Sequence, residues 1–312
     1  MSQPADPDSR NFGTVAIVGV GLIGGSIAMA LKGRGTARSV IGVGRSASRL
    51  QEARDRGIID EGFVELAVAA RRSDLLVFCT PVDRIAAGVR EAAAACRPGT
   101  LITDAGSVKG SICRDLSEEL PSGVEFVGAH PLAGSEKQGF EFAEATLFED
   151  RTCVVTPVAT TSPRALERVS SFWTNLGATL IEMSPEAHDR SLGETSHLPH
   201  LVAAALATTL QSDNRALAAS GFRDTTRIAS GDPDLWSAIL LANRSEVLAS
   251  LARFGRSLDR VQLALEQRDA RALTELLRSA KANRESTVLT TATGARTTGL
   301  EKRTADDADR RG

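Results

Sequence analysis

Residues 128–137 hold the side chains best suited to acid–base chemistry in this chain. The stretch reads Gly-Ala-His-Pro-Leu-Ala-Gly-Ser-Glu-Lys and places His130, one of only four histidines, after a strand-like run. It lies downstream of a glycine-rich fingerprint near the N-terminus. A buried imidazole beside a nicotinamide can accept a hydroxyl proton while hydride leaves the carbon beneath it. The combination favours a hydride-transferring oxidoreductase.

The glycine fingerprint follows a β-branched run and reads Gly19-Val20-Gly21-Leu22-Ile23-Gly24. Gly19 would permit the tight turn, Gly21 would let the backbone approach a pyrophosphate, and Gly24 would allow close strand–helix packing. We therefore expect this turn, with Leu22 and Ile23, to bind a dinucleotide at the start of a helix. The alternative is a glycine turn in an α/β domain that binds no nucleotide.

The end of the second predicted strand indicates which cofactor is bound. An NAD enzyme usually places Asp or Glu there to accept from the ribose 2′-hydroxyl, whereas this chain has Gly44-Arg45-Ser46. Arg45 could pair with a 2′-phosphate and Ser46 could donate a hydrogen bond to it. We favour NADP over NAD, with a solvated surface charge as the alternative for Arg45.

Later segments of the sequence contain further candidate catalytic and ligand-binding residues. Thr80 and Pro81 follow one predicted strand and Ser107 follows the next, at the carboxyl ends where such sheets bind ligands. Ser107 could also be only a helix N-cap. His197 and His200 are spaced by one helical turn, and because no third ligand accompanies them we expect no metal. Arg227 suits a carboxylate-bearing substrate, although a solvated helix face would also explain it.

These residues require a scaffold of alternating strands and helices. The sequence predicts strands at 14–18, 40–43, 75–79, 100–103, 125–128, 153–156 and 179–182, and helices at 26–32, 46–56, 84–96 and 108–120. Such alternation is typical of an α/β Rossmann-type, doubly wound and mostly parallel sheet. After Met183 the pattern is helical, with Ser184-Pro185 and Asp232-Pro233 as helix starts.

The helix opened at Asp232 is predicted to be long. It carries an apolar seam suited to packing against another helix, made of Leu240, Val247, Leu251, Phe254, Leu258, Val261 and Leu265. Intrachain core and subunit interface are equally compatible with the seam. We expect a disordered N-terminus at 1–12, a dinucleotide-binding domain at 13–183, a helical substrate and dimerisation domain at 184–286, and a flexible tail at 287–312.

Composition limits the other function classes. The 312 residues carry a formal net charge of −2 without a block of Lys and Arg, which argues against nucleic acid and anionic membranes as partners. A secretory signal, an apolar run of membrane-spanning length and metal-ligand spacing among the four cysteines are all absent from the sequence, so we expect a cytoplasmic protein with reduced thiols. The chain contains no tyrosine.

Several motifs in this order resemble the prephenate/arogenate dehydrogenases of tyrosine biosynthesis, from about Thr14 to Asn243. They are Gly-Leu-Ile-Gly-Gly-Ser at 21–26, Thr-Asp-Ala-Gly-Ser-Val-Lys at 103–109, His-Pro-Leu-Ala-Gly-Ser-Glu-Lys at 130–137, His-Asp at 188–189, Ser-His-Leu-Pro-His at 196–200, Thr-Thr-Arg-Ile-Ala at 225–229 and Asp-Pro-Asp-Leu-Trp at 232–236. The resemblance implies a homodimer with a Rossmann-type domain followed by an all-helical dimerisation domain. We expect the monofunctional form, because the length leaves no room for a fused chorismate mutase or ACT domain.

The resemblance also implies the chemistry. It would be oxidative decarboxylation of prephenate or arogenate, giving 4-hydroxyphenylpyruvate or tyrosine, with hydride transfer to NAD(P). His130 matches the family's catalytic histidine, and Ser107 would help to hold both the substrate hydroxyl and His130. Arg227 would bind a carboxylate, His200 and less securely His197 would line the pocket, and Lys137 would position the substrate or the domain interface. The alternatives are a β-hydroxyacid-type NADP-dependent dehydrogenase with a catalytic lysine, and a non-catalytic nucleotide-sensing protein.

Overall fold

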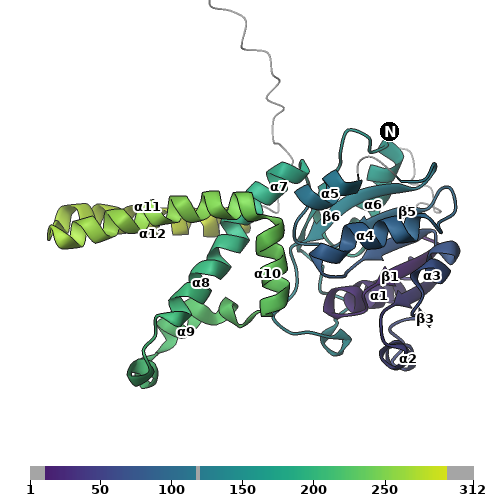
Figure 1. Cartoon of the computed structure of the whole chain (residues 1–312), viewed down its shortest axis with the longest axis horizontal. Helices are drawn as coiled ribbons and strands as arrows, with labels where there is room; N and C mark the ends of the chain where they lie inside the picture. Colours follow the sequence, from purple (N-terminus) through teal and green to yellow (C-terminus); the bar gives the residue numbers. More distant parts are fainter. Residues whose placement is uncertain (1–10, 117–119, 294–312) are drawn as a thin grey trace, which may run out of the picture. The chain divides into compact units, whose positions relative to one another are not determined.

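A computed structural model describes residues 11–116 and 120–293, the stretch 287–293 by its backbone alone (Figure 1). The chain divides into two compact units, one ending at Leu251 and one beginning at Ala252. No helix in the described ranges is both long enough and apolar enough to cross a membrane.

The first unit is built on an eight-stranded sheet of order β3-β2-β1-β4-β5-β6-β7-β8. Every neighbouring pair is parallel except β6 and β7, which are antiparallel. The strands are β1 Thr14–Val18, β2 Ser39–Val43, β3 Glu61–Phe63, β4 Leu75–Phe78, β5 Leu101–Asp104, β6 Glu125–Pro131, β7 Thr152–Thr156 and β8 Thr179–Glu182. The doubly wound, mostly parallel sheet is confirmed. The short edge strand β3 was not predicted, because three residues centred on Gly62 carry no period-two pattern.

Helices cover both faces of the sheet, which explains its almost continuous apolar strands. They are α1 Leu22–Arg34, α2 Ala47–Asp55, α3 Leu66–Arg72, α4 Val82–Ala93, α5 Gly110–Leu116 and α6 Pro163–Asn175. Alternate residues of β1 enter different cores: Val15 and Ile17 pack with α1, α2 and α6, whereas Ala16 and Val18 pack with α3, α4 and α5. The two cores hold the strand ends, and the loops after them, in fixed positions.

Two of the helices that follow the sheet, α7 and α10, begin at a proline that follows a capping residue. Ser184 caps α7 by accepting from the Ala187 N–H, and Asp232 caps α10 by accepting from the Leu235 N–H. The elements are α7 Pro185–Leu192, the π-helical η3 Gly193–His197, α8 Leu198–Thr208, the 3₁₀ turns η4 Ser212–Leu217 and η5 Arg227–Ser230, α9 Ser220–Thr226, α10 Pro233–Ala242, α11 Arg244–Glu266 and α12 Ala270–Thr293. The predicted all-helical character after Met183 is confirmed. Helix α10 packs through Ile239 on the core beneath α4.

The prediction of one long helix from Asp232 is wrong. Helix α10 ends at Ala242 and α11 begins at Arg244, because the side chain of the buried Asn243 donates to the Asp189 carbonyl oxygen and contacts His197 Nδ1. An Asn side chain bonded in this way competes with regular helix geometry. The apolar seam also divides: Val247 is buried, while Leu258 and Leu265 are 52% and 59% exposed in the single chain.

Both predicted chain ends need correction where the structure describes them. Residues 1–10 of the expected disordered N-terminus lie outside the described residues, but Phe12 is buried edge-on against Phe172 and belongs to the core. The tail was expected from residue 287, yet the α12 backbone continues to Thr293. Extending an existing helix is far easier than starting one, so a Thr-rich sequence can continue it. Residues 294–312 lie outside the described residues.

Candidate active site

The sequence-predicted residues of the sheet domain gather at its carboxyl edge. The turn after β1 holds the glycine fingerprint, Thr80 and Pro81 follow β4, Ser107 follows β5, and His130 is the penultimate residue of β6. Strands β1, β4, β5 and β6 are mutually parallel, so their carboxyl ends share one edge. Ligands of doubly wound sheets bind at this edge.

The glycine turn has the geometry of a phosphate cradle. Gly19 has a φ of 99°, and a Cβ there would lie 2.8 Å from the Cys79 carbonyl oxygen. A Cβ on Gly24 would overlap the Gly19 carbonyl oxygen, whereas a Cβ on Gly21 would meet nothing within 4 Å. The space above Gly21 is therefore open at the start of α1, where no side chain caps the helix N–H groups.

Neighbouring atoms also suit a bound dinucleotide. Thr80 Oγ1 is buried and has no hydrogen-bond partner among the described residues, so it is available to a ligand. Leu22 and Ile23 are half-buried at the first turn of α1. The open space, the uncapped helix start and the unpaired hydroxyl together fit the pyrophosphate and nicotinamide half of such a cofactor.

The region after β2 lacks a carboxylate, as the sequence predicts. Arg45 is exposed and makes no hydrogen bond or ion pair within the described residues. Ser46 caps α2 by accepting from the Arg49 N–H at 3.3 Å, and its hydroxyl lies 3.0 Å from that of Ser48. Arg49 is held elsewhere, by an ion pair with Glu141 of 2.6 Å. Among the described residues Arg45 therefore has no partner, and it lies just after the carboxyl end of β2.

A buried ion pair fixes the backbone directly before His130. The paired register of β5 and β6 ends at Thr103 and Val127. Beyond it, Asp104 accepts from the Ala129 N–H at 3.0 Å, and Lys109 Nζ donates to the Ala129 carbonyl oxygen at 2.9 Å. Lys109 and Asp104 also form an ion pair with each other, and neither side chain is exposed. The two side chains therefore continue the strand pairing and hold the end of β6.

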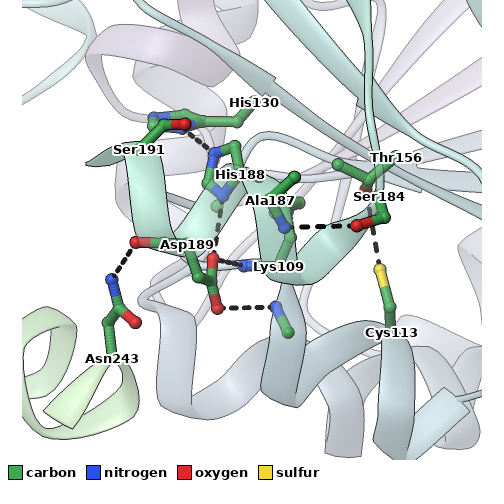
Figure 2. Close-up of polar contacts among 12 residues, drawn as sticks. Lys109, Cys113, His130, Thr156, Ser184, Ala187, His188, Asp189, Ser191 and Asn243 are labelled. Atoms are coloured by element: carbon green, nitrogen blue, oxygen red, sulfur yellow. Dashed lines mark hydrogen bonds and ion pairs between the residues drawn. The ribbon is translucent and has the colours of Figure 1, made fainter. Parts of the chain in front are cut away.

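His130 is the first member of a chain of hydrogen bonds (Figure 2). Its Nδ1 lies 2.8 Å from Nε2 of His188, and His188 Nδ1 lies 2.8 Å from Asp189 Oδ1. The Asp189 carboxylate also accepts from the backbone N–H groups of Lys109 and Gly110, each at 2.8 Å. Helix α7 is thereby joined to the start of α5 and to the carboxyl end of β6.

Burial keeps these imidazoles neutral at neutral pH. Desolvation lowers the pKa of His130 well below its usual 6.5, and His188, Lys109 and His197 lower it further. Burial also lowers the pKa of His188, an effect that the hydrogen bond to Asp189 partly offsets. A neutral imidazole is the form that can accept a proton.

The remaining two histidines adjoin the same cluster. His197 is buried, its pKa is lowered by burial to about 4, and its Nδ1 lies 3.0 Å from Asn243 Nδ2. His200 stacks on Trp236 with ring centroids 3.6 Å apart, and His197 meets Trp236 edge-on. Nδ1 of His200 is buried and has no hydrogen-bond partner in the described part of the chain. All four histidines of the chain lie along one connected set of contacts.

The structure does not bring every predicted residue to this cluster. Ser107 is half-buried, but no hydrogen bond joins it to His130 within the described ranges, and His188 holds His130 Nδ1 instead. Arg227 is exposed on η5, which packs against the helix of His200. Lys137 is exposed, with its ammonium 5.0 Å from the centre of the Phe142 ring. Within the described residues, no hydrogen bond, ion pair or ring contact links Arg227 or Lys137 to the four histidines.

Sequence reasoning assigned no role to His188, Asp189 and Lys109. A signal was present, because a His-Asp pair directly after a capped helix start places two polar side chains in the first turns of a helix that must bury one face. Lys109 carries no such signal, since a lysine is almost never fully buried unless it is paired.

The fold and the site define a nicotinamide-dependent dehydrogenase: a phosphate cradle and a neutral, buried histidine share the carboxyl edge of one doubly wound sheet. Comparison with known proteins is more specific. Residues 27–182 match the nucleotide-binding domain of prephenate dehydrogenase, and residues 184–279 match its dimerization domain. The chain belongs to the prephenate dehydrogenase family.

Individual relatives agree with this assignment. Prephenate dehydrogenase of Bacillus subtilis is 36% identical over 279 residues, which is 87% of this chain and 75% of that protein. A crystal structure of prephenate dehydrogenase from Aquifex aeolicus in complex with hydroxyphenyl propionate and NAD+ has a TM-score of 0.83 and 34% identity, covering 88% of this chain and 98% of that one. Synechocystis arogenate dehydrogenase has a TM-score of 0.75 and 32% identity, covering 88% and 99%.

Proposed function

We propose that this chain catalyses the oxidative decarboxylation of prephenate, arogenate or both, with hydride transfer to a nicotinamide cofactor. The products would be 4-hydroxyphenylpyruvate or tyrosine, and CO₂. The observation that carries the proposal is the neutral, buried His130, held at the carboxyl edge beside the glycine cradle. The named relatives act on prephenate or arogenate, which supports this substrate class.

The chain's own residues would perform the proton chemistry. The nicotinamide, when bound, supplies the hydride acceptor. The substrate hydroxyl gives its proton to the ring nitrogen of His130 that does not face His188, as the carbinol carbon loses hydride. The opposite ring carbon then loses its carboxylate as CO₂, and the electron pair left behind makes the ring aromatic. The proton returns to the ring oxygen, which restores neutral His130.

Substrate binding is assigned to the helical part of the unit. His200 Nδ1 is buried and has no hydrogen-bond partner among the residues described. His197 lies beside the same tryptophan, Trp236, on which His200 stacks. Arg227 would bind the side-chain carboxylate, because pairing the ring carboxylate too strongly would stabilise the ground state and slow the loss of CO₂. Replacing Arg227 by Ala should therefore raise KM for the substrate, and an unchanged KM would refute the binding role.

NADP is the proposed cofactor of choice. Three features favour a 2′-phosphate: the Arg45 cation, which has no partner in the described part of the chain, the hydroxyls of Ser46 and Ser48, and the missing carboxylate after β2. An Arg45→Ala variant should bind NADP at least about tenfold more weakly, since a hydrogen bond to a charged group contributes roughly 1.5–3 kcal/mol, and should bind NAD as before. Equal losses for both cofactors would contradict this assignment.

A homodimer formed through residues 184–286 is also proposed, with the dinucleotide-binding domain at 13–183. The match of residues 184–279 to a dimerization domain supports it, as do the exposed leucines of α11. Exposed Leu258 and Leu265 would be covered by the partner. Analytical ultracentrifugation of the whole chain would detect the dimer.

The composition of the helical part disfavours the alternative of a β-hydroxyacid-type dehydrogenase. A β-hydroxyacid-type dehydrogenase would need a catalytic lysine in the helical part, where residues 184–286 contain only Lys281. That side chain is 75% exposed and lies 3.7 Å from Glu285, as is usual for a surface ion pair. The Lys281 environment is therefore unsuited to proton transfer at a protected site.

The decisive experiment is a grid of initial rates of reduced-cofactor formation, with prephenate or arogenate and with NADP or NAD. Turnover in any combination would establish the enzyme class, and the fastest would identify the substrate and test the role of Arg45. If folded protein binds NADP and turns over neither substrate, the proposed reaction is wrong and the β-hydroxyacid alternative becomes the next to test.

A further inference from the structure

The hydrogen positions around Asp189 follow from its partners. Backbone N–H groups can only donate, so both carboxylate oxygens act as acceptors, from Lys109 N and from Gly110 N. The remaining partner of Oδ1 is His188 Nδ1 at 2.8 Å. A carboxylate has no proton to give, so Nδ1 of His188 must carry the hydrogen of this bond.

The His188 tautomer also fixes the hydrogen positions on His130. A neutral imidazole with its hydrogen on Nδ1 offers Nε2 only as an acceptor. Nε2 of His188 faces His130 Nδ1 at 2.8 Å, so His130 Nδ1 must carry a hydrogen and donate it. Neutral His130 then has its free electron pair on Nε2. The arrangement resembles the way in which a buried aspartate sets the tautomer of a catalytic histidine elsewhere, here extended by one imidazole.

We propose that His188 and Asp189 are positioning residues that hold His130 in its Nδ1–H tautomer and share its positive charge during the reaction. This inference rests on the proposed function for its catalytic meaning. When Nε2 of His130 takes the hydroxyl proton, its Nδ1 proton stays in the bond to His188 or moves onto His188 Nε2. The His188 Nδ1 proton remains on its bond to Asp189, so no proton is lost and the positive charge lies one bond nearer the carboxylate.

The surrounding charges make this sharing necessary. The groups facing the two imidazoles are Lys109, Asp104, Asp189 and the neutral His197. Lys109 and Asp104 compensate each other in their ion pair, which leaves the Asp189 carboxylate as the anion without an ion-pair partner among these facing groups. An imidazolium at His130 would otherwise be formed in a buried site next to a lysine, where a charge is strongly disfavoured.

Nuclear magnetic resonance can test the tautomers without turnover. The chain has only four histidines, so ¹⁵N-labelled imidazoles give a spectrum that single substitutions can assign. At neutral pH we expect His130 and His188 both to carry hydrogen on Nδ1, in the free protein and with saturating NADP. Hydrogen on Nε2 of His130, or a doubly protonated His188 at neutral pH, would overturn the proposal. This outcome is independent of whether prephenate or arogenate is turned over.

Two substitutions of His188 separate positioning from folding. His188→Leu removes the acceptor for His130 Nδ1, and we expect kcat to fall by about 10²–10⁴-fold while KM and cofactor affinity change less than about threefold. His188→Gln keeps an acceptor oxygen near the place of Nε2, so it should retain at least about tenfold more kcat than His188→Leu.

Ser184→Ala provides the matched control. Ser184 caps the helix that carries His188 and touches neither imidazole, so its loss lowers the stability of α7 without altering the tautomer. We expect a lower Tm and an unchanged kcat and pH profile. Unchanged kcat in His188→Leu, or losses of kcat in the Gln and Ser184 variants as large as in the Leu variant, would show a merely structural role. Failure of the wild type on both substrates would instead refute the proposed function and leave the tautomer result standing.

Discussion

Three glycines of one short segment should respond very differently to the same substitution by alanine. Gly21 ends the turn after β1, Gly24 lies in the first turn of α1, and Gly33 lies near the end of that helix. A Cβ at Gly24 would overlap the Gly19 carbonyl oxygen and lie 2.8 Å from Ile17 Cγ2. A Cβ at Gly21 or at Gly33 would meet nothing within 4 Å.

The expected magnitudes follow from these surroundings. Gly33→Ala should raise the free energy of unfolding by about 0.5–1 kcal/mol, because the site is exposed and alanine is the better helix former. Gly24→Ala should lower it by roughly 1–3 kcal/mol, since the backbone oxygen cannot move away cheaply. Gly21 has an extended backbone with φ of −112°, so its alanine variant should change stability by less than about 1 kcal/mol.

Cofactor binding should distinguish Gly21 from Gly33. The open space above Gly21 is where a pyrophosphate would approach the backbone, and a methyl group there would push it away. We expect Gly21→Ala to bind NADP and NAD at least about tenfold more weakly, equivalent to about 1.4 kcal/mol, and Gly33→Ala to bind them as the wild type does.

Urea unfolding and isothermal titration calorimetry on the same three preparations would make the measurement. The pattern to look for is loss of affinity without loss of stability in Gly21→Ala, and loss of both in Gly24→Ala. Wild-type affinity in Gly21→Ala would refute the proposal that a pyrophosphate approaches the backbone at Gly21. A Gly24→Ala variant as stable as Gly33→Ala would refute the statement that a Cβ at Gly24 is crowded by the Gly19 carbonyl oxygen.

Three further predictions concern the buried ionisable side chains Lys109, His130 and His197. Lys109→Met should lower the free energy of unfolding by about 3–5 kcal/mol because it leaves Asp104 buried and unpaired. Arg72→Met, which breaks an exposed pair, should change the free energy of unfolding little in the same denaturation assay. His130→Asn should lower kcat by about 10²–10⁴-fold with cofactor affinity intact, and an active variant would mean that another group is the base. His197 has a pKa of about 4 when folded and about 6.5 when unfolded, so the unfolded chain binds more protons between these values. Stability should therefore fall by up to roughly 3 kcal/mol from pH 6.5 to pH 4, and calorimetry of a His197→Gln variant should show a shallower decline.

The sheet and its cofactor turn were predictable because their signals are local. A strand buried on both faces must be apolar at almost every position, and the run Leu75–Phe78 carries this pattern with no help from the rest of the chain. The requirement for glycine at Gly24 is also set locally, by the Gly19 carbonyl oxygen and the Ile17 side chain a few residues away. Patterns of this kind survive in the sequence whatever the tertiary structure adds.

The chain of hydrogen bonds from His130 to Asp189 was not predictable, because it depends on partners that are distant in the sequence. His130 and His188 are 58 positions apart, and their hydrogen bond exists only after β6 and α7 have packed on the same edge of the sheet. Lys109 is fully buried only because Asp104 and the Ala129 carbonyl oxygen receive its ammonium group. The end of α10 at Asn243 has the same origin, since an asparagine ends a helix when its side chain finds partners elsewhere.

The stacking of Trp236 on His200 gives the site an optical signal of its own. The chain has two tryptophans and no tyrosine, and the second tryptophan, Trp173, is fully buried among phenylalanines in the sheet core. Trp173 should therefore emit as a constant background, while Trp236 reports on whatever enters beside its imidazole partner. A phenolic product formed by this protein would absorb and fluoresce against a polypeptide that contains no phenol, so binding and release could be followed with no added dye.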